Sequence, residues 1–115
     1  MKNSKIKKTS TITVNVGLNE NNIPMRLMWS ADDSGIENQE AKAMFLSFWD
    51  TKDQNTLKMD LWVDDMSVEE MKQFTHQTLL TLAENFEKAT GEKNMSEDLR
   101  DYCLHFAEKM KIMPE

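Results

Sequence analysis

The sequence is poor in cysteine, glycine and proline, with one, three and two of these residues among 115. A lone cysteine, Cys103, cannot form an internal disulfide, and its place in an amphipathic pattern favours a small buried side chain over a reactive thiol. The three glycines are isolated, so there is no glycine-rich loop for nucleotide phosphates and no G-x-S-x-G turn to present a serine. Disulfide-stabilised folds and the common nucleotide-binding and hydrolase classes are therefore excluded.

Long hydrophobic runs are missing as well. The apolar stretches are a few residues long, far short of the ~20 residues of a membrane-spanning helix. Residues 1–10 lack the apolar segment of an export signal. Together with the lone cysteine, these absences favour a cytoplasmic protein without a transmembrane segment.

Length and composition fit one soluble folded domain. Hydrophobic residues make up 39% and charged residues 30%, and ten methionines supply much of the apolar volume. A chain of 115 residues has room for one core. We expect a single α+β domain over residues 9–115, preceded by a basic tail or strand start at residues 1–8.

The net charge of −6 conceals an asymmetry along the chain. Four of the 14 basic residues precede position 9, and the remaining ten face 20 acidic side chains. An acidic body repels phosphates, which argues against nucleic acid as a partner. The early basic residues predict either a solvated strand end or a weak peripheral contact with anionic lipid. They are Lys2, Lys5, Lys7 and Lys8.

No cluster of residues indicates catalysis or metal binding. His76 and His105 have no ligand-type residue spaced to share a metal along their own helix face. Cys103 and His105 lie two positions apart, so they point to different sides of a helix and form no nucleophile–base pair. The acidic residues Asp64, Asp65, Glu69 and Glu70 are explained by the helix that begins there, because a helix N-terminus favours negative charge. We expect no enzymatic activity, no cofactor and no metal.

Alternation of polar and apolar residues predicts four strands in an antiparallel meander. The turn-rich segment Asn19–Asn22 joins the first two strands into a hairpin, and the polar loop Asp50–Asn55 joins the last two. Glu37–Lys42 is predicted to be a polar connector, with a short helical turn as one option. The strands are Ile6–Leu18, a strand opening at Pro24 with Met25, Leu27 and Trp29 on its core face, Ala43–Trp49, and Thr56–Val63.

The last two strands fix their own register if the hairpin is centred between Lys52 and Asp53. Apolar side chains then meet on one face as Phe48–Leu57, Leu46–Met59 and Met44–Leu61. Large aromatic and charged side chains fall on the opposite face, a composition typical of interface hot spots. The predicted partner-binding residues are Phe45, Trp49, Lys58, Asp60 and Trp62. Alternatively, a loop, the N-terminal strand or a second copy of the chain covers them.

Two helices follow the strands. The capping box of Ser67 and Glu70 opens the first helix, and Gly91 supplies the left-handed residue at its end. Ser96, followed by two acidic residues, is predicted to cap the second helix. The apolar stripe of that helix is Leu99, Tyr102 or Cys103, Phe106, Met110 and Met113, and Pro114 ends the pattern. The expected fold is α+β, with a four-stranded antiparallel meander followed by two C-terminal helices packed on one face.

An ordered set of motifs runs through most of the chain. They are Trp29–Asp33, Ile36–Asn38, Glu40–Ala43, Trp49–Asp50, Thr56–Trp62, Asp65–Lys72, His76–Leu79 and Ala89–Thr90. This set resembles the gliding motility protein GldC family, and the resemblance covers the chain from about Ile12 onward. The resemblance implies a small cytoplasmic accessory protein of bacterial gliding without enzymatic activity or cofactor, and it supplies no ligand residues. Ser67 stands where proline would be expected in that family, and it strengthens the cap.

The leading hypothesis is a non-enzymatic protein-interaction module of the gliding machinery, with a protein partner and with homo-oligomerisation left open. An alternative is a small acidic secretion-type chaperone that holds an extended client segment. A third reading is a small-molecule pocket between sheet and helices, lined by His76, Tyr102 and Cys103.

Overall fold

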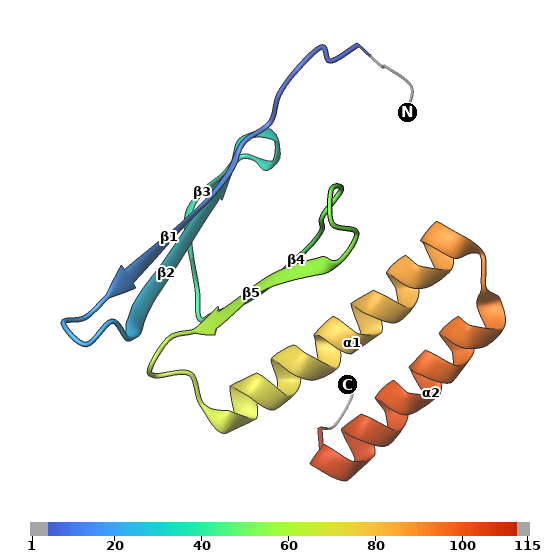
Figure 1. The fold of residues 1–115 in the computed structure, drawn as a ribbon. Coiled ribbons are helices and arrows are strands. Elements are labelled where there is room, and N and C mark those ends of the chain that lie inside the picture. Colours follow the sequence, from blue (N-terminus) through green and yellow to red (C-terminus); the bar gives the residue numbers. More distant parts are fainter. Residues whose placement is uncertain (1–4, 113–115) are drawn as a thin grey trace. The chain divides into compact units, whose positions relative to one another are not determined.

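The structure is a computed structural model that describes residues 5–112, and it is of the α+β class (Figure 1). It divides into two compact units, which we call the strand unit (residues 5–66) and the helix unit (residues 67–112). The predicted class and the C-terminal position of the helices are confirmed. The packing of the helices on a sheet and the single domain over residues 9–115 stay predictions. The elements are β1 (Ile12–Leu18), β2 (Pro24–Ala31), the 3₁₀ turn η1 (Asp32–Ser34), β3 (Ile36–Ala41), β4 (Ala43–Trp49), β5 (Thr56–Trp62), α1 (Val68–Thr90) and α2 (Lys93–Met110).

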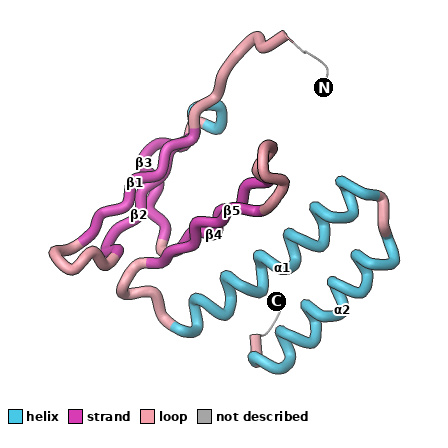
Figure 2. The backbone as a smooth tube through the Cα atoms, in the orientation of Figure 1, coloured by secondary structure: helices cyan, strands magenta, loops and turns pink. Residues whose placement is uncertain are grey.

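The described strands form two antiparallel sheets, so the prediction of one four-stranded meander is wrong (Figure 2). One sheet has the order β1-β2-β3, and the other is the β4–β5 hairpin. The unpredicted element is β3, which occupies most of the segment Glu37–Lys42 that was expected to be a connector. It pairs with β2 along the side on which β4 was expected. As an edge strand with polar residues on both faces, β3 lacks the alternation that marks a half-buried strand.

The two sheets are joined where β3 passes into β4 through the single residue Lys42. The Val63 N–H donates to the Lys42 carbonyl over 2.8 Å. The Asp64 N–H donates to the carbonyl of Pro24, the first residue of β2, over 2.9 Å. The end of β5 is therefore tied by its backbone both to the β3–β4 junction and to the start of β2.

The β1–β2 hairpin was predicted correctly, although β1 begins at Ile12 and not at Ile6. Val14 lies opposite Trp29 and Val16 opposite Leu27, so the apolar positions of both strands share a face. The Asn19 side-chain oxygen shapes the turn by accepting hydrogen bonds from backbone N–H groups at positions 21 and 23. The buried apolar residues of the strand unit are Leu27, Ala31 and Val63.

Both ends of α1 follow from local sequence signals. The Glu70 N–H donates to the Ser67 hydroxyl over 3.0 Å, and the Ser67 N–H donates to the Glu70 carboxylate over 2.9 Å. This reciprocal pair is the predicted capping box. Gly91 ends the helix in the left-handed region with φ of 76°, where a side chain would be strained.

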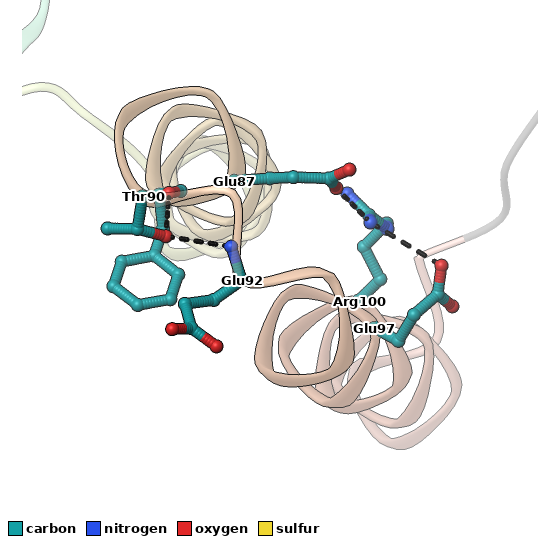
Figure 3. Close-up of polar contacts among 6 residues, drawn as sticks. Glu87, Thr90, Glu92, Glu97 and Arg100 are labelled. Carbon is teal, nitrogen blue, oxygen red and sulfur yellow. Dashed lines mark hydrogen bonds and ion pairs between the residues drawn. The ribbon is translucent and has the colours of Figure 1, made fainter.

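The predicted cap of the second helix is wrong, because α2 begins three residues earlier than Ser96. Glu92 occupies the N-cap position without a side-chain hydrogen bond. Thr90 supports the turn instead: its hydroxyl donates to the Phe86 carbonyl over 2.7 Å and accepts from the Glu92 N–H over 3.1 Å (Figure 3). Since Gly91 and Glu92 alone separate the helices, α2 starts at once and Ser96 falls inside its first turns.

The buried residues of the two helices all have small side chains. Ala83 of α1 and three residues of α2 are buried, and we call them the helix seam: Ala83, Ser96, Cys103 and Ala107. Of the two sequence alternatives, Cys103 is the buried one, whereas Tyr102 is exposed. Met113 and Pro114, predicted to end the stripe, lie outside the described residues. Small residues at these positions allow close approach of the two backbones.

Candidate interaction face of the β4–β5 hairpin

The register predicted for the β4–β5 hairpin is confirmed along its whole length. Phe48 lies opposite Leu57, Phe45 opposite Asp60, and Ala43 opposite Trp62. Because side chains alternate between the faces of a strand, all five predicted partner residues share one face of the hairpin. We call this surface the aromatic face: Phe45, Trp49, Lys58, Asp60 and Trp62.

The aromatic side chains of this face are open within the strand unit. Trp49 is 68% exposed, Trp62 52% and Phe45 38%. Exposure of this extent means that neither the N-terminal strand nor any loop of the described strand unit buries the two tryptophans. The alternative in which such a segment covers them is therefore excluded for residues 5–66.

An ion pair lies among the aromatic rings. The Lys58 ammonium is 3.5 Å from the Asp60 carboxylate, two positions along β5 on the same face. Both side chains reach solvent, so the pair contributes little to folding stability. It gives the face one donor group and one acceptor group beside a large apolar area, which suits recognition of a partner with mixed polar and apolar contacts.

A hollow of about 370 Å³ adjoins Trp62 and Asp60 within the strand unit. Its other walls include Ile23, Pro24 and Met66. Met66 is near Trp62 in sequence, but Ile23 and Pro24 are brought to this site by long-range pairing, which includes the hydrogen bond between Asp64 and Pro24. That contact joins positions 40 residues apart in the chain, and no local pattern predicts it.

The family comparison matches residues 24–112 to the family described as "Gliding motility-associated protein GldC-like". The chain belongs to the GldC-like family. The match extends from β2 to the end of the described helix unit and includes the whole aromatic face, whereas β1 precedes it. The resemblance seen in the sequence motifs is confirmed. No curated protein and no solved structure matches this GldC-like chain.

The other residues with chemical potential in this GldC-like chain have structural roles. Cys103 is buried in the helix seam, and burial raises the pKa of its thiol, which disfavours the reactive thiolate. His76 of α1 stacks on Phe106 of α2 with ring centroids 6.0 Å apart, so it makes an interhelical contact. Within residues 5–112, no three His, Cys, Asp or Glu side chains gather at one point.

The N-terminal lysines are described from Lys5 onward, and Lys2 lies outside the described residues. Lys5, Lys7 and Lys8 are exposed, and the Lys8 ammonium lies 3.0 Å from the Asp33 carboxylate. Hydrogen bonds from Ser10 and then from Lys8 lower the pKa of Asp33. None of the described helices is long and apolar enough to span a bilayer. A weak lipid contact through these lysines stays a prediction.

Proposed function

We propose that this GldC-like protein is a non-enzymatic accessory component of gliding motility that binds a protein partner through the aromatic face. Family membership associates it with gliding. The single observation that carries the proposal is the placement of three aromatic rings around the Lys58–Asp60 ion pair on one open strand face. The cytoplasm is the proposed site of action, and the partner belongs to the gliding or envelope machinery.

The composition of the face supports protein binding. Tryptophan is enriched among residues whose truncation weakens protein–protein complexes most. Trp49 and Trp62 lie at opposite ends of the hairpin, and the hollow beside Trp62 offers a recess for an apolar partner side chain. Folding of the strand unit leaves these rings exposed, so they are available for contact with another surface.

The direct test replaces both tryptophans with alanine. We expect Trp49→Ala/Trp62→Ala to stay folded and to lose partner capture and colony spreading together, with each substitution weakening binding by about 2 kcal/mol, roughly 30-fold. Tyr102→Ala is the matched control, because it removes an equally exposed aromatic side chain from α2. A folded double variant with unchanged capture and spreading would overturn the proposal.

A second experiment locates the contact on one side of the hairpin. A photo-crosslinking amino acid that replaces Ser47 lies on the aromatic face opposite Lys58. The same amino acid in place of Leu57 lies on the other face of the hairpin. Both positions are exposed. We expect a crosslinked partner in living cells from Ser47 and not from Leu57. Equal crosslinking from the two positions would contradict a partner site confined to the aromatic face.

The same crosslinking distinguishes the chaperone alternative. An accessory protein yields assembled components of the gliding machinery. A secretion-type chaperone yields newly made proteins before export, and its yield falls when protein synthesis is stopped. Capture that depends on continuing synthesis would replace the accessory role with the chaperone role.

A further inference from the structure

β1 is an edge strand whose outer side is unprotected. Within the described residues no strand pairs with that side. The segment Thr9–Asn19 contains no charged residue and no proline, and Ile12, Val14 and Leu18 are exposed. Native proteins usually guard an edge with charge, proline or a bulge, because its unpaired N–H and C=O groups accept any suitable strand.

The opposite edge of the same sheet shows what such protection looks like. β3 carries Glu37 and Glu40, and Asn38 between them has a left-handed φ of 49°. Its pairing with β2 shifts register between Trp29 and Ala31. Charge and irregularity therefore blunt β3, whereas in β1 the only irregularity lies at its end, between Gly17 and Leu18.

The hydrogen bonds of β1 show which of its residues point their backbone outward. The Asp32 N–H donates to the Thr11 carbonyl over 3.1 Å, so residue 11 belongs to the set bonded to the neighbouring strand. In an antiparallel pair, alternate residues face the neighbour and the residues between them face away. Ile12, Val14 and Val16 therefore direct their N–H and C=O groups toward the free edge.

We propose that a second copy of this chain pairs with this edge, β1 against β1 in antiparallel orientation, with the two-fold axis at Val14. Each Val14 then faces Val14 of the second copy, and each Ile12 faces Val16 of the second copy. These pairs use the outward backbone groups of both strands. They also continue the apolar face that Val14 and Val16 share with Trp29 and Leu27, giving one sheet of twice the width.

Charge at the ends of the segment specifies both the occupant and the orientation. Val14 is the midpoint of the uncharged segment, which is preceded by Lys8 and followed by Glu20. Antiparallel self-pairing places each Lys8 toward Glu20 of the second copy, whereas parallel pairing would bring lysine to lysine. A segment that complements itself end to end is what a two-fold interface requires, and an unrelated strand would have no reason to match it.

Cysteine pairing tests the register. Facing Cα atoms are about 5.5 Å apart in such a pair, within disulfide range. We expect Val14→Cys to form a disulfide-linked dimer under mild oxidation. Ile12→Cys and Val16→Cys each place their own two cysteines about 13 Å apart, so neither links to itself, but a mixture of the two variants does. The unsubstituted chain, whose one cysteine is the buried Cys103, is the negative control.

Any other linkage pattern contradicts the proposal. Linked dimers of Ile12→Cys alone would mean a different register. Absence of linkage in Val14→Cys, with the unsubstituted chain sedimenting as a monomer at the highest soluble concentration, would mean that the edge has no second copy on it.

Charge substitution tests the interface in solution. Val14→Lys brings two like charges together at the axis and should give a monomer, whereas Thr13→Lys, on the other face of the same strand, should leave the dimer. Glu20→Lys should weaken the dimer about tenfold because two exposed ion pairs become repulsive. A Val14→Lys variant that still sediments as a dimer would overturn the interface. This surface is separate from the aromatic face, so either proposal can fail alone.

Discussion

The strand unit and the helix unit are stabilised in different ways. The helix unit is stabilised by the caps of α1 and by the helix seam. Each of its buried residues is an alanine, a serine or a cysteine. The strand unit is held mainly by backbone pairing, and Leu27 and Val63 are its largest buried side chains. Large apolar residues stay exposed in both, including Phe48, Leu57 and Met59 opposite the aromatic face. Within each unit, surface available for contact is therefore abundant, whereas closely packed interior is scarce.

The two units have separate optical probes. Trp29, Trp49 and Trp62 are the chain's three tryptophans, and all of them lie in the strand unit. Helices dominate the circular dichroism signal at 222 nm, so that signal reports on the helix unit. Thermal or urea unfolding followed by both probes shows whether a substitution in one unit also destabilises the other, and separate transitions would exclude two-state unfolding of the whole chain.

The largest expected effect is at the centre of the helix seam. Ala83 is completely buried, and Ala83→Leu should force the helices apart and cost about 2 to 3 kcal/mol of unfolding free energy. The 222 nm transition should shift to lower urea. Ala89→Leu, on an exposed part of the same helix, should change stability by less than about 0.5 kcal/mol. Equal effects of the two substitutions would show that the seam is not closely packed.

A pair of serine substitutions separates a true cap from a buried hydroxyl. Ser67→Ala removes the cap of α1 and should cost about 1 kcal/mol. The Ser96 hydroxyl is buried without a hydrogen-bond partner, so Ser96→Ala should be neutral or should stabilise by up to about 1 kcal/mol. Urea midpoints at 222 nm give both values. Destabilisation by Ser96→Ala would instead support the capping role that the sequence predicted for Ser96.

A smaller effect is expected in the β4–β5 loop. Gln54 has a left-handed φ of 54°, and its N–H donates to the Asp50 carbonyl over 2.9 Å. Gln54→Gly removes the strain of the left-handed conformation, although glycine also raises the entropy of the unfolded chain. The net result should be a gain of about 0.5 kcal/mol in unfolding free energy. Asn55→Gly, at a neighbouring position without a positive φ, should destabilise. Tryptophan fluorescence during urea unfolding checks both variants.

The smallest effect depends on pH. The Arg100 guanidinium donates to the Glu87 carboxylate over 2.6 Å and lowers its pKa below the ordinary value of 4.5 (Figure 3). A lowered folded-state pKa contributes stability that is present above the ordinary value and is lost as pH falls through the folded value. Glu87→Gln should therefore be slightly less stable than the unsubstituted chain at pH 7, and the difference should shrink as pH falls below 4.5. Both side chains are about one third exposed, so solvent screening keeps the difference small. Urea unfolding followed at 222 nm gives the difference in midpoint between Glu87→Gln and the unsubstituted chain. A difference that does not change with pH would exclude this ion pair as its cause.

The aromatic face was predictable because the hairpin that builds it is local. A loop of a few residues and strict alternation specify the register, and the five residues then share a face by geometry. The hollow beside Trp62 was not predictable, since two of its walls, Ile23 and Pro24, approach only after β2 and β5 meet.

The sequence by itself determined the GldC-like motifs, the capping box at Ser67, the stop at Gly91 and the register of β4 with β5. Each of these rests on residues close in the chain, whose spacing fixes their geometry. The tertiary structure alone decided that Ile36–Ala41 is a strand and that Ser96 is buried. Those outcomes depend on backbone pairing with β2 and on the approach of two helices, which act between distant residues and leave no periodic mark in the sequence.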